Sequence, residues 1–166
     1  MNVTISTRPC IRVFTLLALV LVAGFVSAQN VDHKVLGIET GVLYSYDVGT
    51  GTIGNGTSVA LNLTLSDSLT AGFVFLKGDG TGIPANSSLL SLSYGLADRF
   101  GMSVMLGQNA TAATVLTGLG MYFNIFERKL QDAVSTVLKA KIDYIFAPGA
   151  LNTGDLTIGL CVSVGI

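Results

Sequence analysis

The chain has 166 residues, of which half are apolar and only 11% are charged, with nine basic and ten acidic residues and a mean hydropathy of +0.66. Because soluble proteins average about 25% charged residues, this composition argues against a nucleic-acid-binding domain, a disordered segment and a charge-rich coiled coil. Beyond the N-terminal region, no run reaches the roughly 18 apolar residues that a membrane-spanning helix needs. The composition therefore predicts strands that face a membrane or a fully buried interior.

Residues 1–28 have the layout of a secretory signal peptide. Two arginines precede an apolar stretch over 13–26, and Val26 and Ala28 are residues that cleavage accepts at the third and first positions before the cut. The stretch is shorter than the about 20 residues of a membrane span, so cleavage is favoured over the alternative of an uncleaved anchor. The predicted mature chain, residues 29–166, has seven basic and ten acidic residues and one cysteine.

Eight segments of the mature chain alternate between apolar residues and polar or small ones. Successive side chains of a strand point to opposite faces, so each segment is predicted to be a strand with one apolar face. The clearest case is 58–66, where valine and leucine occupy every second position. The predicted strands cover 36–46, 58–66, 69–76, 90–96, 100–106, 115–125, 134–146 and 156–166.

The seventh segment is ambiguous, because several of its leucines and valines also fit helical spacing. Its apolar residues recur with period two over 134–146, opposite Lys139, Lys141 and Asp143, and this favours a strand. A helical turn over 127–132 is compatible with the sequence ahead of it.

The connections between the predicted strands alternate in length. Shorter turns are expected around Asp67, around Asp98 and over 127–132. The long, glycine-rich loops are predicted over 47–57, 77–87, 108–114 and 147–154. Short turns at one end and longer loops at the other, on an even number of strands, are typical of outer-membrane barrels.

Over the whole predicted mature part, these strands and connections resemble those of the small eight-stranded outer-membrane β-barrels of the OmpA, OmpX and OmpW kind. The resemblance implies an all-β fold, in which residues 29–166 form a closed antiparallel up-and-down transmembrane barrel and residues 1–28 are a cleavable signal peptide. It also implies a monomer in a bacterial outer membrane, in contact with the lipid bilayer and inserted by the barrel-assembly machinery.

Aromatic residues indicate which face of the barrel is apolar. Nine of the eleven aromatic residues of the mature chain fall on the apolar parity, where they form two predicted girdles. Aromatic rings prefer the membrane interface, so the apolar face is predicted to point outward. A soluble periplasmic ligand carrier, with its apolar face inward, is the alternative. The outer girdle comprises Tyr44, Tyr46, Phe73, Phe75, Tyr144 and Phe146, and the inner girdle comprises Tyr94, Phe100 and Phe123.

The opposite, inward parity is mostly Gly, Ser, Ala and Thr, with four charged residues that sum to zero: Glu39, Lys139, Lys141 and Asp143. An ion-pair network in the lumen is predicted from them. The interior of an eight-stranded barrel is just wide enough for side chains or one small ligand, so a water-filled pore is not expected. The alternative is a narrow gated conduit in which lysine and glutamate exchange partners.

The last predicted strand alternates to the end of the chain. The resemblance implies that the assembly machinery reads this strand through Leu160, Val162, Val164 and Ile166, and Ile166 stands where an aromatic residue is usual.

No enzymatic activity, metal site or cofactor is predicted. His33 is the only histidine and precedes the first predicted strand, so no histidine-based triad can form within one chain. Gly49, Gly51 and Gly54 match a dinucleotide-binding pattern, but a strand follows them where that pattern needs a helix. Cys161 falls on the inward parity and is predicted to be a buried, inert thiol.

The expected function is a structural and surface-presenting role in the bacterial envelope. The resemblance also implies two other activities, contact with a surface partner as in OmpX-like proteins and passage of small hydrophobic compounds as in OmpW-like ones. The predicted loops have few aromatic residues or arginines, which usually supply interface hot spots, and this counts against tight adhesion. No nucleic-acid partner is expected.

Overall fold

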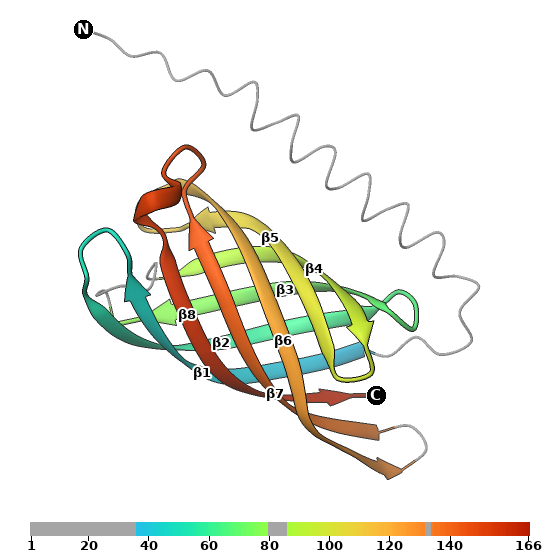
Figure 1. The fold of residues 1–166 in the computed structure, drawn as a ribbon. Helices are drawn as coiled ribbons and strands as arrows, with labels where there is room; N and C mark the ends of the chain where they lie inside the picture. The colour runs from blue at the N-terminus through green and yellow to red at the C-terminus, as the bar shows by residue number, and fades with distance from the viewer. Residues whose placement is uncertain (1–35, 80–85, 132–133) are drawn as a thin grey trace, which may run out of the picture.

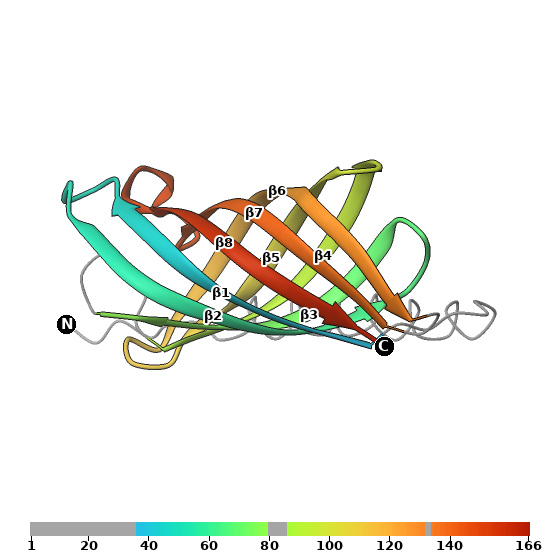
Figure 2. The ribbon, with the colours of Figure 1, turned by 90° about the horizontal axis from the view of Figure 1, so that it is seen from below.

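The computed structural model describes residues 36–79, 86–131 and 134–166, and these form the closed eight-stranded antiparallel barrel that the sequence predicts (Figure 1, Figure 2). Neighbouring strands follow chain order, and β1 pairs with β8 to close the barrel. The strands are β1 (Leu36–Asp47), β2 (Ile53–Thr64), β3 (Leu69–Gly78), β4 (Ser87–Ala97), β5 (Phe100–Asn109), β6 (Thr114–Gln131), β7 (Val134–Phe146) and β8 (Asp155–Gly165). The predicted signal peptide lies outside the described residues.

Both ends of the described barrel chain lie at one end of the barrel, where the backbones of Leu36 and Ile166 hydrogen-bond to each other. This end is called the inner end below, and the opposite end, which carries Asp47, is called the outer end. A 3₁₀ helix (Leu151–Thr153) lies between β7 and β8 at the outer end. Among the described residues, no helix is long and apolar enough to cross a bilayer.

The first outer loop is shorter than predicted, because β2 begins at Ile53 and not at residue 58. Gly54 and Gly56 pair with Ser45 and Leu43 of β1. Asn55 and Thr57 occupy outward positions of this stretch, so it has no apolar alternation and residues 53–57 were predicted as part of a loop. Of the three glycines in the dinucleotide-like pattern, Gly54 is therefore a strand residue.

The prediction of a strand for the seventh segment is confirmed, and 127–131 do not form a helical turn. These residues extend β6 and pair with β7, for example Glu127 with Val137. A register shift between Asn124 and Phe126 marks a bulge. Because β5 begins at Phe100, opposite Phe123, β6 and β7 extend beyond β5 at the inner end, whereas β8 pairs with β7 as far as Ser135 (Figure 1).

The apolar parity forms the outer wall of the barrel. Leu61, Leu119 and Leu160 each expose about half of their surface, at 48%, 53% and 52%, because an eight-stranded barrel has no second layer to cover them. This arrangement contradicts the alternative of a soluble carrier, which requires a polar exterior and an apolar lumen.

Candidate functional site

The lumen of the barrel has three layers along its axis: a polar chamber near the inner end, an apolar layer above it, and a cavity at the outer mouth. Each layer is built from inward-facing residues of several strands, which the barrel register brings to one level.

The polar chamber is a cavity of about 50 Å³, which is large enough to hold water. Glu39, which exposes 4% of its surface, accepts hydrogen bonds from the amines of Lys139 and Lys141, each at 3.0 Å. These three residues are called the charged cluster below. The chamber is lined by Glu39, Ala60, Asn62, Thr70, Val74, Ser91, Ser93, Ser103, Met105, Tyr122, Lys139 and Lys141.

Small residues on β8 let the cluster form. Glu39 lies on β1 and the lysines on β7, with β8 between them. The β8 residues beside the lysines are Gly159 and Cys161, and neither fills the space that the long lysine side chains cross. The Nζ atom of Lys139 also lies 5.8 Å from the centre of the Tyr122 ring, within the range of a cation–π contact.

Asp143, the fourth residue of the predicted network, does not join the charged cluster. It exposes only 7% of its surface, and its Oδ1 atom has no hydrogen-bond partner among the described residues. This oxygen lies over Gly120, where the Oγ atom of Ser103 is also close, so a side chain at residue 120 would collide with both. The structure thus brings together three of the four predicted charges.

The apolar layer is the part of the lumen that the sequence reasoning missed. One buried cluster takes side chains from seven of the eight strands, and each member exposes 6% or less of its surface. It is called the septum here and comprises Leu43, Ala60, Val74, Leu76, Leu89, Met105, Leu116 and Ile145. The signal was present as scattered large residues on a parity otherwise rich in glycine and serine, but only the register shows that they meet.

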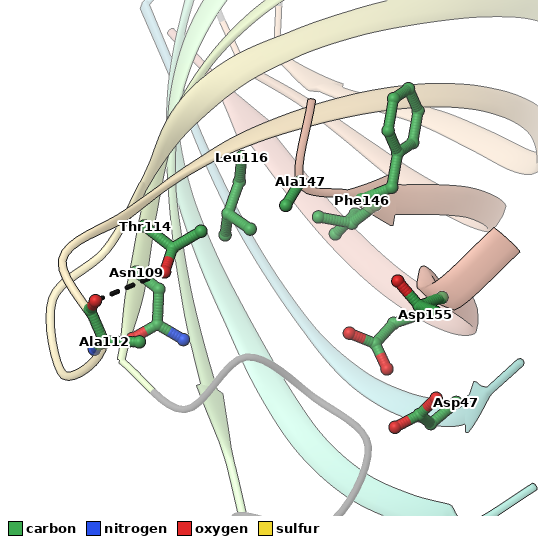
Figure 3. A pocket seen from close by; sticks show the side chains of 10 residues that line it. Asp47, Asn109, Ala112, Thr114, Leu116, Phe146, Ala147 and Asp155 are labelled. Atoms are coloured by element: carbon green, nitrogen blue, oxygen red, sulfur yellow. Dashed lines mark hydrogen bonds between the residues drawn. The ribbon is translucent and has the colours of Figure 1, made fainter. Parts of the chain in front are cut away.

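The mouth cavity lies at the outer end and has a volume of about 280 Å³. Figure 3 shows Asp47 and Asp155 on one side of it and Asn109, Ala112 and Thr114 on the other. Asp47 of β1 and Asp155 of β8 are register partners. The Oδ1 atom of Asp47 accepts hydrogen bonds from the backbone amides of Gly49 at 2.8 Å and Thr50 at 3.0 Å.

The two mouth carboxylates differ electrostatically. Tyr46, Ile53 and Leu156 are the outermost outward-facing residues of their strands, so Asp47 and Asp155 lie beyond the apolar band of the outer wall. Partial burial and the neighbouring Asp47 raise the pKa of the Asp155 carboxyl to about 7. Hydrogen bonds from the backbone of Thr50 and Gly49 lower the pKa of Asp47.

The predicted girdle residues all lie on the outer wall, although Phe73 is at the middle of β3 and not at its outer end. Phe73 and Phe75 pack edge to face with ring centres 4.6 Å apart, and Tyr144 and Phe146 lie 5.5 Å apart. Phe126, which was not predicted, exposes 56% of its surface near the inner end. The β6 bulge changes its parity, so alternation alone could not find it.

Three of the four residues predicted to act in assembly lie on the outward face of β8, where Leu160, Val162 and Val164 expose 52%, 42% and 41% of their surface. The fourth, Ile166, follows β8 and exposes 64%. Cys161, between them on the inward face, is buried. Within the described ranges, no three His, Cys, Asp or Glu side chains are grouped to hold a metal ion.

The barrel is similar in fold to a known structure, although no match to a protein family accompanies it. No family model matches the chain, and no curated protein matches it. Among solved structures, the chain is similar to a designed protein from work described as "De novo design of transmembrane beta-barrels", with 10% sequence identity and a TM-score of 0.45. The match covers 78% of this chain and 95% of that one. The resemblance to OmpA-like, OmpX-like and OmpW-like barrels therefore has no family match beside it and stays a prediction.

Proposed function

We propose that this protein is a monomeric barrel of a bacterial outer membrane that contributes to envelope structure, presents its outer loops to the exterior and does not conduct ions at rest. In this proposal the protein has no enzymatic activity, and its partners are the lipid bilayer and the barrel-assembly machinery.

The outer wall supports the membrane location. Soluble proteins rarely expose contiguous apolar patches larger than a few hundred Å², whereas here large apolar residues cover outward positions of all eight strands. A closed barrel is also one of the two structures that can satisfy every backbone hydrogen bond inside a bilayer. The free-energy cost of exposing these apolar side chains is lowest when they contact lipid acyl chains.

The observation that carries the structural role is the septum. Its members meet inside the barrel from seven strands and are almost completely buried. Apolar side chains therefore fill the lumen at this level, and what the protein offers to the exterior is the mouth with its loops.

Labelling of single cysteines tests both the location and the orientation. Ala112 is an exposed loop residue at the outer end, and Ser66 is an exposed turn residue at the inner end. The native Cys161 is buried and gives little background. In intact cells that express the full chain, a membrane-impermeant maleimide is expected to label the Ala112→Cys variant but to label the Ser66→Cys variant only after lysis.

Two further results belong to the same experiment. We expect the protein in the outer-membrane fraction, with its N-terminus at Gln29. Equal labelling of both variants in intact cells, or recovery of the protein in the soluble fraction, would contradict the proposal.

A conduit for small hydrophobic compounds is the second candidate function. It is favoured by an apolar groove of about 450 Å³ on the outer wall, which fits an apolar compound or an acyl chain. Uptake of a hydrophobic fluorescent dye by cells with and without the protein distinguishes the two functions, because the structural role predicts no difference. The groove is lined by Leu36, Leu61, Asn62, Leu63, Ala71, Gly72, Phe73 and Leu90.

A further inference from the structure

The septum separates two cavities that would otherwise form one path through the barrel. The floor of the mouth cavity includes Leu116 and Ile145. The polar chamber is bounded by Ala60, Val74 and Met105. All five residues belong to the septum, so the mouth cavity and the chamber approach it from opposite sides.

Glycines on neighbouring strands let the septum side chains close over the lumen. A Cβ atom at Gly118 would lie 2.9 Å from Cε of Met105 and 3.5 Å from Cγ1 of Ile145. In the same way, Leu43 lies over Gly159 of β8. The septum side chains therefore fill space that larger residues on β6 and β8 would take.

The charged cluster closes the lumen less completely. Its lysines are held against Glu39, toward the β7–β8–β1 side of the barrel. The chamber remains beside them, bordered by Ser91 and Ser103 of β4 and β5. The chamber thus extends beside the cluster, whereas apolar side chains that are almost completely buried fill the lumen at the septum.

We propose that the septum is a hydrophobic gate that alone blocks a path for small inorganic ions through this barrel, and that the charged cluster does not seal it. An ion that enters an apolar constriction loses its hydration without gaining polar contacts. The same ion in the chamber keeps water and hydroxyl groups around it. The inference rests on the proposed membrane location and closed resting state.

Planar-bilayer recordings on the full-length gene product, purified from membranes, test the gate. Leu89 and Ile145 expose 0% and 2% of their surface and lie on β4 and β7. The variant L89S/I145S is expected to raise ion flux about tenfold or more, equivalent to about 1.4 kcal/mol off the barrier. The matched control L90S/I142S, with leucine and isoleucine replaced at outward positions of the same two strands, is expected to stay closed.

A second variant, E39Q/K139Q/K141Q, neutralises and shortens the charged cluster, and we expect it to stay closed like the wild type. A conducting cluster variant, or a folded but silent L89S/I145S, would overturn the gate while leaving the structural role intact. Conduction by the wild type would contradict the closed resting state itself. Folding is checked by the shift between unheated and boiled samples on an SDS gel. If L89S/I145S does not fold, L89A replaces it, with the same prediction of a measurable gain and the same consequence if it is silent.

Discussion

Asp155 is the residue whose protonation changes most between the folded and unfolded chain at the outer mouth. Its pKa is raised to about 7 by partial burial and by Asp47 beside it, whereas an unfolded aspartate titrates near 3.9. Between these values the folded barrel holds a proton that the unfolded chain has released. Asp155 therefore reduces stability progressively as the pH rises from about 4 to about 7.

We predict that Asp155→Asn makes the barrel less sensitive to pH. The wild type should lose more stability than D155N between pH 5 and pH 8, because only the wild type must ionise a carboxyl beside Asp47. Guanidinium unfolding in detergent micelles at each pH, followed by far-UV circular dichroism, measures the difference. The control Asp67→Asn, at an exposed inner turn, should keep the wild-type pH dependence, and an equal drop in D155N and wild type would refute the prediction.

Glu39 holds two positive charges in the lumen, so the members of the charged cluster are not equivalent. Replacing it by glutamine leaves Lys139 and Lys141, both largely buried, without the carboxylate that pairs with both of them. We predict a loss of about 3 kcal/mol or more in the free energy of unfolding for Glu39→Gln.

Lys141→Met should cost about 1 kcal/mol, because Lys139 still donates to Glu39 at 3.0 Å. Unfolding of both variants in the same lipid vesicles provides the comparison. If the two substitutions cost the same, the glutamate is not the centre of the cluster.

At the scale of the strands, alternation in the sequence predicts those elements that place apolar residues at every second position. It predicts β1 and β8 almost to their ends, because their outward faces are apolar except at Thr40. It misses the first residues of β2, where Asn55 and Thr57 face outward, and the last residues of β6, where a bulge after Asn124 shifts the parity. Parity also predicted the lumenal charges. Parity could not predict the septum. The septum residues are single large side chains far apart in the sequence, and only the strand register brings them to one level.

A charged residue on the outer wall should reduce stability more when it lies near the middle of the membrane than when it lies near the interface. Leu119 lies near the middle of the barrel wall, opposite Val104 and Tyr144, and Ile53 is the first residue of β2 at the outer end. We predict that Leu119→Arg costs about 2–4 kcal/mol, whereas Ile53→Arg costs about 0–1 kcal/mol, because arginine at the bilayer midplane is the more expensive. Folding yields and unfolding in lipid vesicles measure both, and similar costs would contradict the placement of the membrane across the middle of β6.

At the scale of the whole molecule, the barrel differs from a small soluble protein in where most of its large apolar side chains lie. Its apolar septum inside the lumen is a packed core, but it is small, and most large apolar side chains lie on the outer wall. Transfer of that wall out of water is worth about 25 cal/mol per Å², and the chain alone gains none of it by folding. The fold therefore depends on an apolar solvent around it.

Refolding of residues 29–166 from denaturant should therefore require detergent or lipid. With detergent we expect a strand-type circular dichroism spectrum and a band that migrates differently before and after boiling; in buffer alone we expect aggregation. The chain contains no tryptophan, so circular dichroism and gel mobility are better measures than intrinsic tryptophan fluorescence. A chain that folds and stays soluble in buffer alone would show that water can solvate this wall, and the membrane location would then fail together with the roles that depend on it.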